Sequence, residues 1–105
     1  MYWVYLVLAG LFEVGWPLGL KLSQTMSSKI IGIRIALVSM SLSGWLLWMA
    51  QKSIPIGTAY AVWTGIGAVG TLLVGVLFFG DSASVGRMLS ALLIVIGIIG
   101  LKIFH

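Results

Sequence analysis

Four long apolar segments, separated by short polar stretches, limit what this chain can fold into. They cover residues 2–22, 30–50, 58–79 and 85–104. A helix of about 20 mainly apolar residues crosses the hydrocarbon core of a bilayer, so each segment is long enough to span a membrane. Glycine, serine and proline in the intervening stretches are typical of turns. The sequence therefore predicts an all-α membrane protein, with four transmembrane helices forming one domain over residues 1–105.

The composition agrees with a membrane protein. Of the 105 residues, 61% are hydrophobic and 8% are charged, whereas charged residues make up about a quarter of a typical soluble domain. The net charge of +4 would also fit a nucleic-acid-binding protein, but such a protein clusters its bases on one face. Here the bases stand singly at or near the edges of the apolar segments, where they anchor helices at lipid headgroups: Lys21, Lys29, Arg34, Lys52, Arg87 and Lys102. We therefore expect membrane lipid, and no nucleic acid, as a partner.

Side chains for catalysis and cofactor chemistry are scarce. The chain has no cysteine, so disulfides and thiolate metal sites are excluded. Its single histidine, His105, is terminal, and no nucleophile and base share a helix face. No basic region precedes the first apolar segment, so we expect no cleavable signal peptide. The sequence predicts neither an enzyme, nor a metal site, nor a cofactor.

Glu13 is the only acid within any of the four apolar segments. A charged carboxylate at the centre of a bilayer costs roughly 2.5–3.5 kcal/mol on insertion scales, so such residues usually face an interior cavity and serve transport or proton transfer. The alternative is an acid tolerated near a helix end, or one paired with a base for structural reasons. No base lies at a comparable depth, since Arg34 is near the end of its own segment. We therefore expect Glu13 to bind a substrate and a proton.

The neighbours of Glu13 in the first segment suit a polar pocket. Gly10 and Trp16 lie about one helical turn before and after the acid, on the same face. The indole N–H of Trp16 needs a partner when buried, although the ring would also serve as a packed aromatic. Pro17 lacks the N–H that would bond to the Glu13 carbonyl four residues back, which predicts a kink and a spare backbone acceptor beside the acid.

The second and third segments each carry a stripe of small, polar or aromatic residues at helical spacing. The second has Gly32, Ala36, Ser39 and Ser43, and the third has Tyr60, Trp63, Gly67 and Gly70. We place Ser43 in the pocket and Ser39 at its periphery, although serines in membrane helices often bond their own backbone. Gly65 and Gly67 weaken the middle of the third helix, which predicts a hinge.

The aromatic residues of these segments fall into two groups. Tyr60 and Trp63, three positions apart, either lie in the interfacial belt or stack on a flat or hydrophobic cation in the pocket. Trp45 and Trp48 do not follow the serine stripe of the second segment. We therefore expect them to face lipid or the membrane edge.

The fourth segment has no ionisable group in its apolar part before Lys102. Its Gly97 and Gly100 permit close helix contact. We therefore assign this segment to assembly, with the glycine pair at a dimer interface, and the first three segments to the pocket. Asp81, which lies between the third and fourth segments, is expected to be solvated.

Three motifs resemble the small multidrug resistance family, and in particular its guanidinium exporters. They are residues 11–14 (LFEV) with Trp16 and residues 20–21 (LK), residues 55–67 (PIGTAYAVWTGIG), and residues 97–102 (GIIGLK). The resemblance covers the whole chain. The chain departs from the family pattern at Gly15 and Pro17, where bulkier or helix-favouring residues are usual, so the resemblance does not fix the shape of the pocket beside Glu13 or the exact substrate.

The resemblance implies proton-coupled export of a small organic cation across the bacterial inner membrane by an antiparallel homodimer with one shared site. Some members of the family pair two different chains, so a heterodimer is the alternative. Carried over by position, Glu13 binds substrate and proton in turn, Trp16 and Ser43 are its hydrogen-bonding neighbours, and Tyr60 and Trp63 line the pocket. One end of the bundle carries four bases and the other two. This weak bias permits insertion in both orientations, which we favour, and also a fixed orientation with the four-base end in the cytoplasm.

Guanidinium fits this chemistry because it is a flat cation with a fork of N–H donors. Such a group suits bidentate bonding to a carboxylate, and its faces suit stacking on tryptophan. The nearest rival is export of quaternary ammonium or other hydrophobic cations by the same mechanism. A more distant rival is a membrane protein that transports nothing and serves as a structural or regulatory partner.

Overall fold

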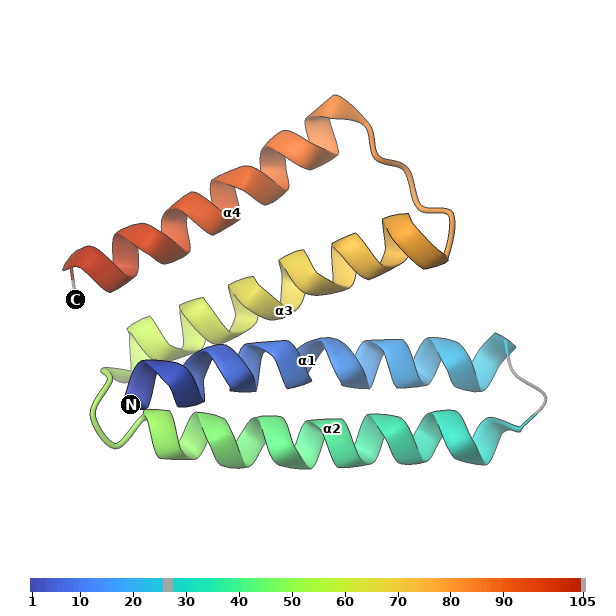
Figure 1. The fold of residues 1–105 in the computed structure, drawn as a ribbon, viewed down its shortest axis with the longest axis horizontal. Coiled ribbons are helices and arrows are strands. Elements are labelled where there is room, and N and C mark those ends of the chain that lie inside the picture. The colour runs from blue at the N-terminus through green and yellow to red at the C-terminus, as the bar shows by residue number, and fades with distance from the viewer. Residues whose placement is uncertain (26–27, 105) are drawn as a thin grey trace.

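The computed structural model describes residues 1–25 and 28–104. Within them the chain forms four helices: α1 (Tyr2–Thr25), α2 (Lys29–Ala50), α3 (Ile56–Phe78) and α4 (Val85–Phe104). Each is long and apolar enough to cross a membrane. The predicted all-α class with four transmembrane helices is thus confirmed. Figure 1 shows α1 beside α2, α3 next to this pair, and α4 on the far side of α3.

Small residues bring α1 and α2 into close contact. A Cβ atom added to Gly19 would lie 2.5 Å from the Ala36 nitrogen and 2.7 Å from the Gly32 carbonyl oxygen, so a larger residue does not fit there. Gly32 in turn packs against the backbone of Ser23. Small residues are what allow two membrane helices to approach so closely. The small-residue stripe of the second segment therefore faces α1.

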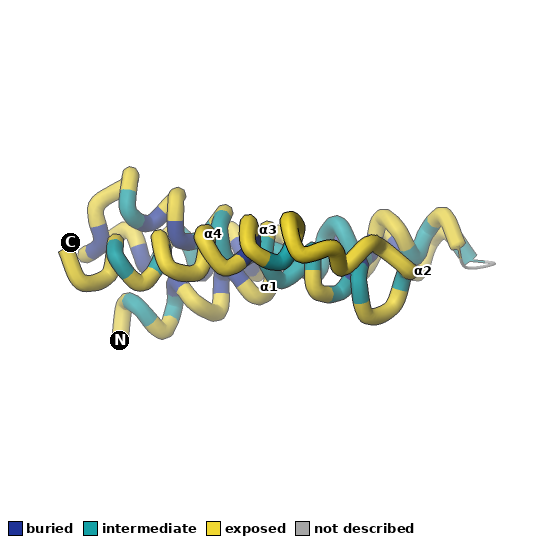
Figure 2. The backbone as a smooth tube through the Cα atoms, turned by 90° about the horizontal axis from the view of Figure 1, so that it is seen from above, coloured by how far each residue is buried: buried dark blue, intermediate teal, exposed yellow. Residues whose placement is uncertain are grey.

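The most buried cluster lies toward the end of the bundle that holds the turn between α2 and α3. It consists of Leu6, Ala50, Ile54, Ala59 and Val62. Figure 2 shows buried positions concentrated toward this end, where the N-terminus also lies. The opposite end, where α3 turns into α4, is therefore less tightly enclosed.

α4 packs mainly against α3 and is the most exposed helix. A Cβ atom on Gly65 of α3 would lie 2.9 Å from Ile98 Cδ1, so this glycine allows the contact. Ala91 is the buried residue of α4, and most of its large aliphatic side chains are exposed. A Cβ atom on Gly97 or Gly100 would meet nothing within 4 Å in the described part of the chain. Their face of α4 is therefore left for lipid or another protein.

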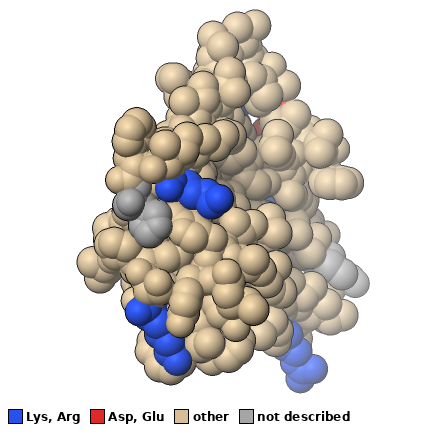
Figure 3. Space-filling model, turned by 60° about the vertical axis from the view of Figure 1, so that its left-hand side comes forward, with Lys and Arg blue, Asp and Glu red and all other residues tan. Residues whose placement is uncertain are grey.

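Charged side chains are sparse on the surface. Figure 3 shows Lys and Arg side chains at separate places on a face that is otherwise almost uncharged. Two bases pack on tryptophan rings: the Lys52 Nζ atom lies 4.5 Å from the Trp48 ring centre, and the Lys102 Nζ atom 5.8 Å from that of Trp3. Bases and tryptophans at helix ends are typical of the membrane interface. Trp45 and Trp48 are 54% and 58% exposed, as expected of residues that face lipid.

Candidate functional site

Glu13 is half-buried on α1 and bonded to a side chain of its own helix. The Trp16 Nε1–H group donates a hydrogen bond to Glu13 Oε1 over 2.7 Å. The two residues are three positions apart, so they lie on the same helix face. A carboxylate has two oxygens and about four acceptor positions. The bond to Trp16 therefore orients the carboxylate and leaves it able to accept further hydrogen bonds.

Gly67 of α3 makes the space that the Glu13 side chain occupies. A Cβ atom at position 67 would overlap Glu13 Cγ and lie 3.0 Å from Glu13 Cβ. A Cβ atom at Gly70, the next small residue along this face, would likewise overlap Val14 Cγ2. α3 remains helical through Gly65 and Gly67, and a hinge at these glycines stays a prediction. In this structure the two glycines allow contacts with α4 and α1, respectively.

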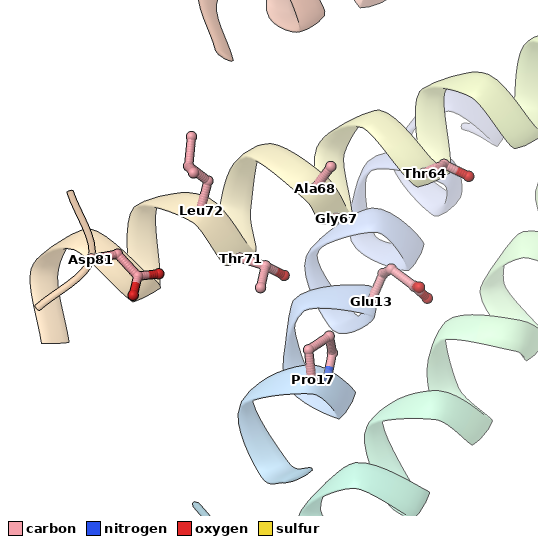
Figure 4. A pocket seen from close by; sticks show the side chains of 8 residues that line it. All are labelled: Glu13, Pro17, Thr64, Gly67, Ala68, Thr71, Leu72 and Asp81. Atoms are coloured by element: carbon pink, nitrogen blue, oxygen red, sulfur yellow. The ribbon is translucent and has the colours of Figure 1, made fainter. Parts of the chain in front are cut away.

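An open cleft of about 470 Å³ lies beside Glu13, between α1 and α3. Its volume is within the range of small-molecule sites. Figure 4 shows that its residues come from α1, α3 and the loop after α3, and they are Glu13, Pro17, Thr64, Gly67, Ala68, Thr71, Leu72 and Asp81. The cleft thus combines one partly buried acid with hydroxyl groups, a second acid and an apolar wall.

Three polar residues of this cleft were not among the residues predicted from sequence: Thr64, Thr71 and Asp81. Thr64 and Thr71 lie on one face of α3 with Ala68 between them, a spacing of four and three residues that periodicity alone would have revealed. Asp81 lies in the loop after α3, where no periodic pattern predicts its position. It is exposed, as expected, but it also lines the cleft.

Ser43, Tyr60 and Trp63 form a second polar group, which does not line this cleft. The Trp63 Nε1–H group donates to Ser43 Oγ over 2.8 Å, and the Ser43 hydroxyl donates to the Ala9 carbonyl oxygen over 2.6 Å. Ser43 is only 1% exposed. The Tyr60 ring lies against Trp63, with 5.6 Å between ring centres. Ser43 therefore bonds to another helix and not to its own backbone, and the chain of bonds joins α1, α2 and α3 one turn from Glu13.

The remaining predicted residues lie around these two groups. Gly10 is buried against Ile66 of α3, and Gly15 packs against Ser39 Oγ of α2. Pro17 lies inside α1, which continues to Thr25. A larger residue at position 15 would collide with Ser39. Gly15 therefore permits closer packing of α1 on α2 beside the acid than a bulkier residue at this position would.

The donor set of this site suits a cation or a proton. Among the described residues, no group of three or more His, Cys, Asp or Glu side chains could hold a metal ion; His105 lies outside them. The cleft offers a half-buried carboxylate, threonine hydroxyl groups and a second carboxylate. The Trp16 indole bonds to Glu13, whereas the Tyr60 and Trp63 rings belong to the second polar group. In an apolar surrounding such a carboxylate binds a proton or a positively charged ligand.

Comparison with known proteins finds a family model and several curated proteins that match nearly the whole chain. The sequence model of a family described as "Small Multidrug Resistance protein" matches residues 1–103. A "Guanidinium exporter" of Yersinia pseudotuberculosis is 56% identical over 103 residues, which cover 98% of each chain. Proteins of the same name from Salmonella typhimurium and Escherichia coli K12 are 51% and 50% identical over 106 residues, covering 98% of this chain and 97% of theirs.

Proposed function

This chain belongs to the small multidrug resistance family, and on that premise we propose that it exports guanidinium or small guanidinyl cations in exchange for protons. Its four apolar helices and its family make it a multi-pass protein of the bacterial inner membrane and a transporter. The substrate is proposed from the name of relatives such as these three, which are 50–56% identical over nearly the full length.

The observation that carries the proposal is the placement of Glu13. Its carboxylate is held by Trp16 Nε1 and lines a cleft that also contains threonine hydroxyls. A guanidinium ion has donors in a flat fork that matches a carboxylate, so Glu13 would accept two of its hydrogen bonds side by side. The threonine hydroxyls would accept others. A cation without N–H donors would leave these acceptors unused.

Coupling to protons follows from the use of one carboxylate for two ligands. Protonated Glu13 has no charge with which to hold a cation, and cation-bound Glu13 does not take a proton. If the loaded protein exposes the site to one side of the membrane and then to the other, each cation that leaves is exchanged for protons that enter. Where two Glu13 carboxylates share the site, one cation is exchanged for two protons, so each cycle moves net charge and is measurable as a current. Binding of either ligand then shifts the populations of the two states, which is alternating access.

A second copy of the chain would complete the site. The cleft is open, and α4 presents exposed aliphatic side chains around Gly97 and Gly100. We propose an antiparallel homodimer in which α4 packs against α4 of the partner and the two Glu13 residues share one site. Pairing with a related but different chain is the alternative. The molecular mass of the purified complex distinguishes the two when the chain is expressed without any relative. A dimer under these conditions is a homodimer, whereas a monomer indicates that a different chain is required.

Transport by purified protein in liposomes tests the function. We expect guanidinium chloride to evoke a current that depends on the proton gradient, and the Glu13→Gln variant, with the same size but no charge, to evoke none. A tetraalkylammonium salt tests the rival substrate class, which the apolar wall formed by Pro17, Ala68 and Leu72 would accommodate. A larger response to that salt than to guanidinium, or transport by the variant, would contradict the proposal.

A further inference from the structure

Asp81 is the other acid of this chain, and it lies at the far end of the cleft that contains Glu13. The sequence has two acids in total, and both line the same cleft. Figure 4 shows Glu13 on α1 and Asp81 on the loop after α3, with Thr71 between them. Because α3 ends at Phe78, Asp81 marks the end of the cleft near the membrane surface.

The position of Asp81 is set by two glycines. Gly80 has a φ angle of +73°, a left-handed conformation that glycine adopts without strain and that commonly ends a helix. The chain therefore turns back, and the Asp81 N–H group donates to the Gly75 carbonyl oxygen over 3.0 Å. The Asp81 Oδ2 atom lies in the space that a Cβ atom of residue 75 would fill. The carboxylate thus packs directly against the backbone of α3 at Gly75.

The two acids contact α3 at positions that are regularly spaced along the helix. Glu13 lies against Gly67, Asp81 lies against Gly75, and Thr71 is midway between these glycines. At 1.5 Å per residue, each step of four residues advances about 6 Å, so the two carboxylates are about 12 Å apart along the helix. Acceptor groups therefore occur at Asp81, Thr71 and Glu13 in steps that a small cation can cross.

Helix capping does not explain the acid at position 81. A negative charge beside the C-terminus of α3 is disfavoured by the helix dipole. The N-terminus of α4 already has its own cap, because Ser84 Oγ accepts a hydrogen bond from the Arg87 N–H group over 3.4 Å. Lys21 lines an adjoining cleft together with Asp81. Without Asp81, Lys21 would be the one charged side chain among the described residues that line that adjoining cleft, and its positive charge would repel cations.

We propose that Asp81 is a second cation-binding residue, which captures the guanidinyl cation at the mouth of the cleft and passes it along Thr71 to Glu13. This inference rests on the function proposed above. In an antiparallel dimer the two copies of Asp81 would lie at opposite membrane surfaces, so each opening of the shared site would have its own capture residue.

The test measures the guanidinium concentration that gives half of the maximal current in liposomes. Exposed ion pairs are weak, so Asp81→Asn should raise this concentration by about two- to fivefold at about 0.01 M salt. The maximal current should stay the same, because Glu13 is intact. The difference should vanish near 1 M salt, where screening removes the attraction. Lys21→Gln should shift the concentration in the opposite direction.

Three further variants separate capture from a merely structural role. Asp81→Glu keeps the charge and should behave like the unaltered protein. Gly75→Ala fills the seat of the carboxylate and should reproduce the effect of Asp81→Asn, although it removes no charge. Ser82→Ala, next to Asp81 in the same loop, should change nothing.

The two proposals fail in different ways. If Asp81→Asn and the unaltered protein have the same half-saturating concentration at low salt, Asp81 has no role in capture and the transport function stands. If Asp81→Asn lowers the maximal current and leaves that concentration unchanged, the residue is structural and the inference is again overturned. If the unaltered protein gives no guanidinium current, the proposed function fails and the role of Asp81 fails with it.

Discussion

The Glu13 side chain is held from two sides. Trp16 donates to its carboxylate from within α1, and the backbone of Gly67 on α3 lies against its aliphatic part. A hydrogen bond to a charged group contributes roughly 1.5–3 kcal/mol, so the carboxylate has a preferred position before any ligand arrives. A positioned group loses less freedom on binding than a mobile one, which favours affinity for a small ligand.

Spacing along the chain predicted one of these two contacts and not the other. Glu13 and Trp16 are three residues apart in one helix, so their proximity follows from helix geometry alone. The contact between Glu13 and Gly67 depends on how α1 and α3 are aligned, and no periodic pattern within either segment specifies that alignment. For this reason the sequence indicated only a flexible helix at Gly67, and the space it provides for the acid became visible in the structure.

Gly67→Ala should weaken ligand binding at the site while leaving the fold intact. Its Cβ atom would overlap Glu13 Cγ, and overpacking of this kind costs about 1–3 kcal/mol. Because the acid must move, we expect guanidinium to bind about tenfold more weakly, as measured by titration of the purified protein. Gly44→Ala is the control, since a Cβ atom there meets nothing within 4 Å in the described part of the chain. Equal affinity of the two variants would contradict the assigned role of Gly67.

At the scale of helices, the bundle is joined by small residues and by one buried chain of hydrogen bonds. The glycines of α1 and α2 allow close packing, and the bonds from Trp63 to Ser43 and from Ser43 to Ala9 connect α3, α2 and α1. Unsatisfied polar groups are costly in lipid. The network therefore favours one relative placement of the three helices, and Tyr60 is held beside it through its contact with Trp63.

The helices themselves were predictable because their length and apolar character are set by the bilayer. The stripe with Gly32, Ala36 and Ser43 was predictable for the same kind of reason, since helical periodicity puts these residues on one face. The position of Asp81 was not predictable, because it depends on the left-handed turn at Gly80 and on the seat at Gly75. Loops between helices carry no periodicity from which such contacts can be inferred.

Ser43→Ala should loosen the three-helix arrangement. The substitution leaves the Trp63 indole N–H group without its acceptor, and a buried polar group without a partner costs about 1–3 kcal/mol. We expect the free energy of unfolding in detergent to fall by this amount. Tryptophan fluorescence monitors the unfolding. Ser41→Ala is the matched control, because the exposed Ser41 hydroxyl bonds only to the Leu37 carbonyl of its own helix. If both variants are equally stable, the network does not hold the helices together.

At the scale of the whole molecule, one copy of the chain leaves much of its apolar surface uncovered. The cleft beside Glu13 is open, and α4 lies at the edge of the bundle with most of its large side chains exposed. Lipid can cover an apolar helix, but it cannot supply polar partners for a carboxylate. The proposed partner chain would cover α4 and contribute polar groups to the site that the two copies share.

Gly97→Leu should therefore separate assembly from folding. A Cβ atom at position 97 meets nothing within 4 Å in the described part of the chain, and the neighbouring large side chains of α4 are exposed, so the single copy should fold as before. Close helix contacts in membranes depend on small residues, so the dimer should weaken and guanidinium-evoked current should fall with it. Cross-linking in liposomes measures the dimer. Gly86→Leu, also on α4 and also facing open space, is the control. A stable, active Gly97→Leu dimer would place the interface elsewhere.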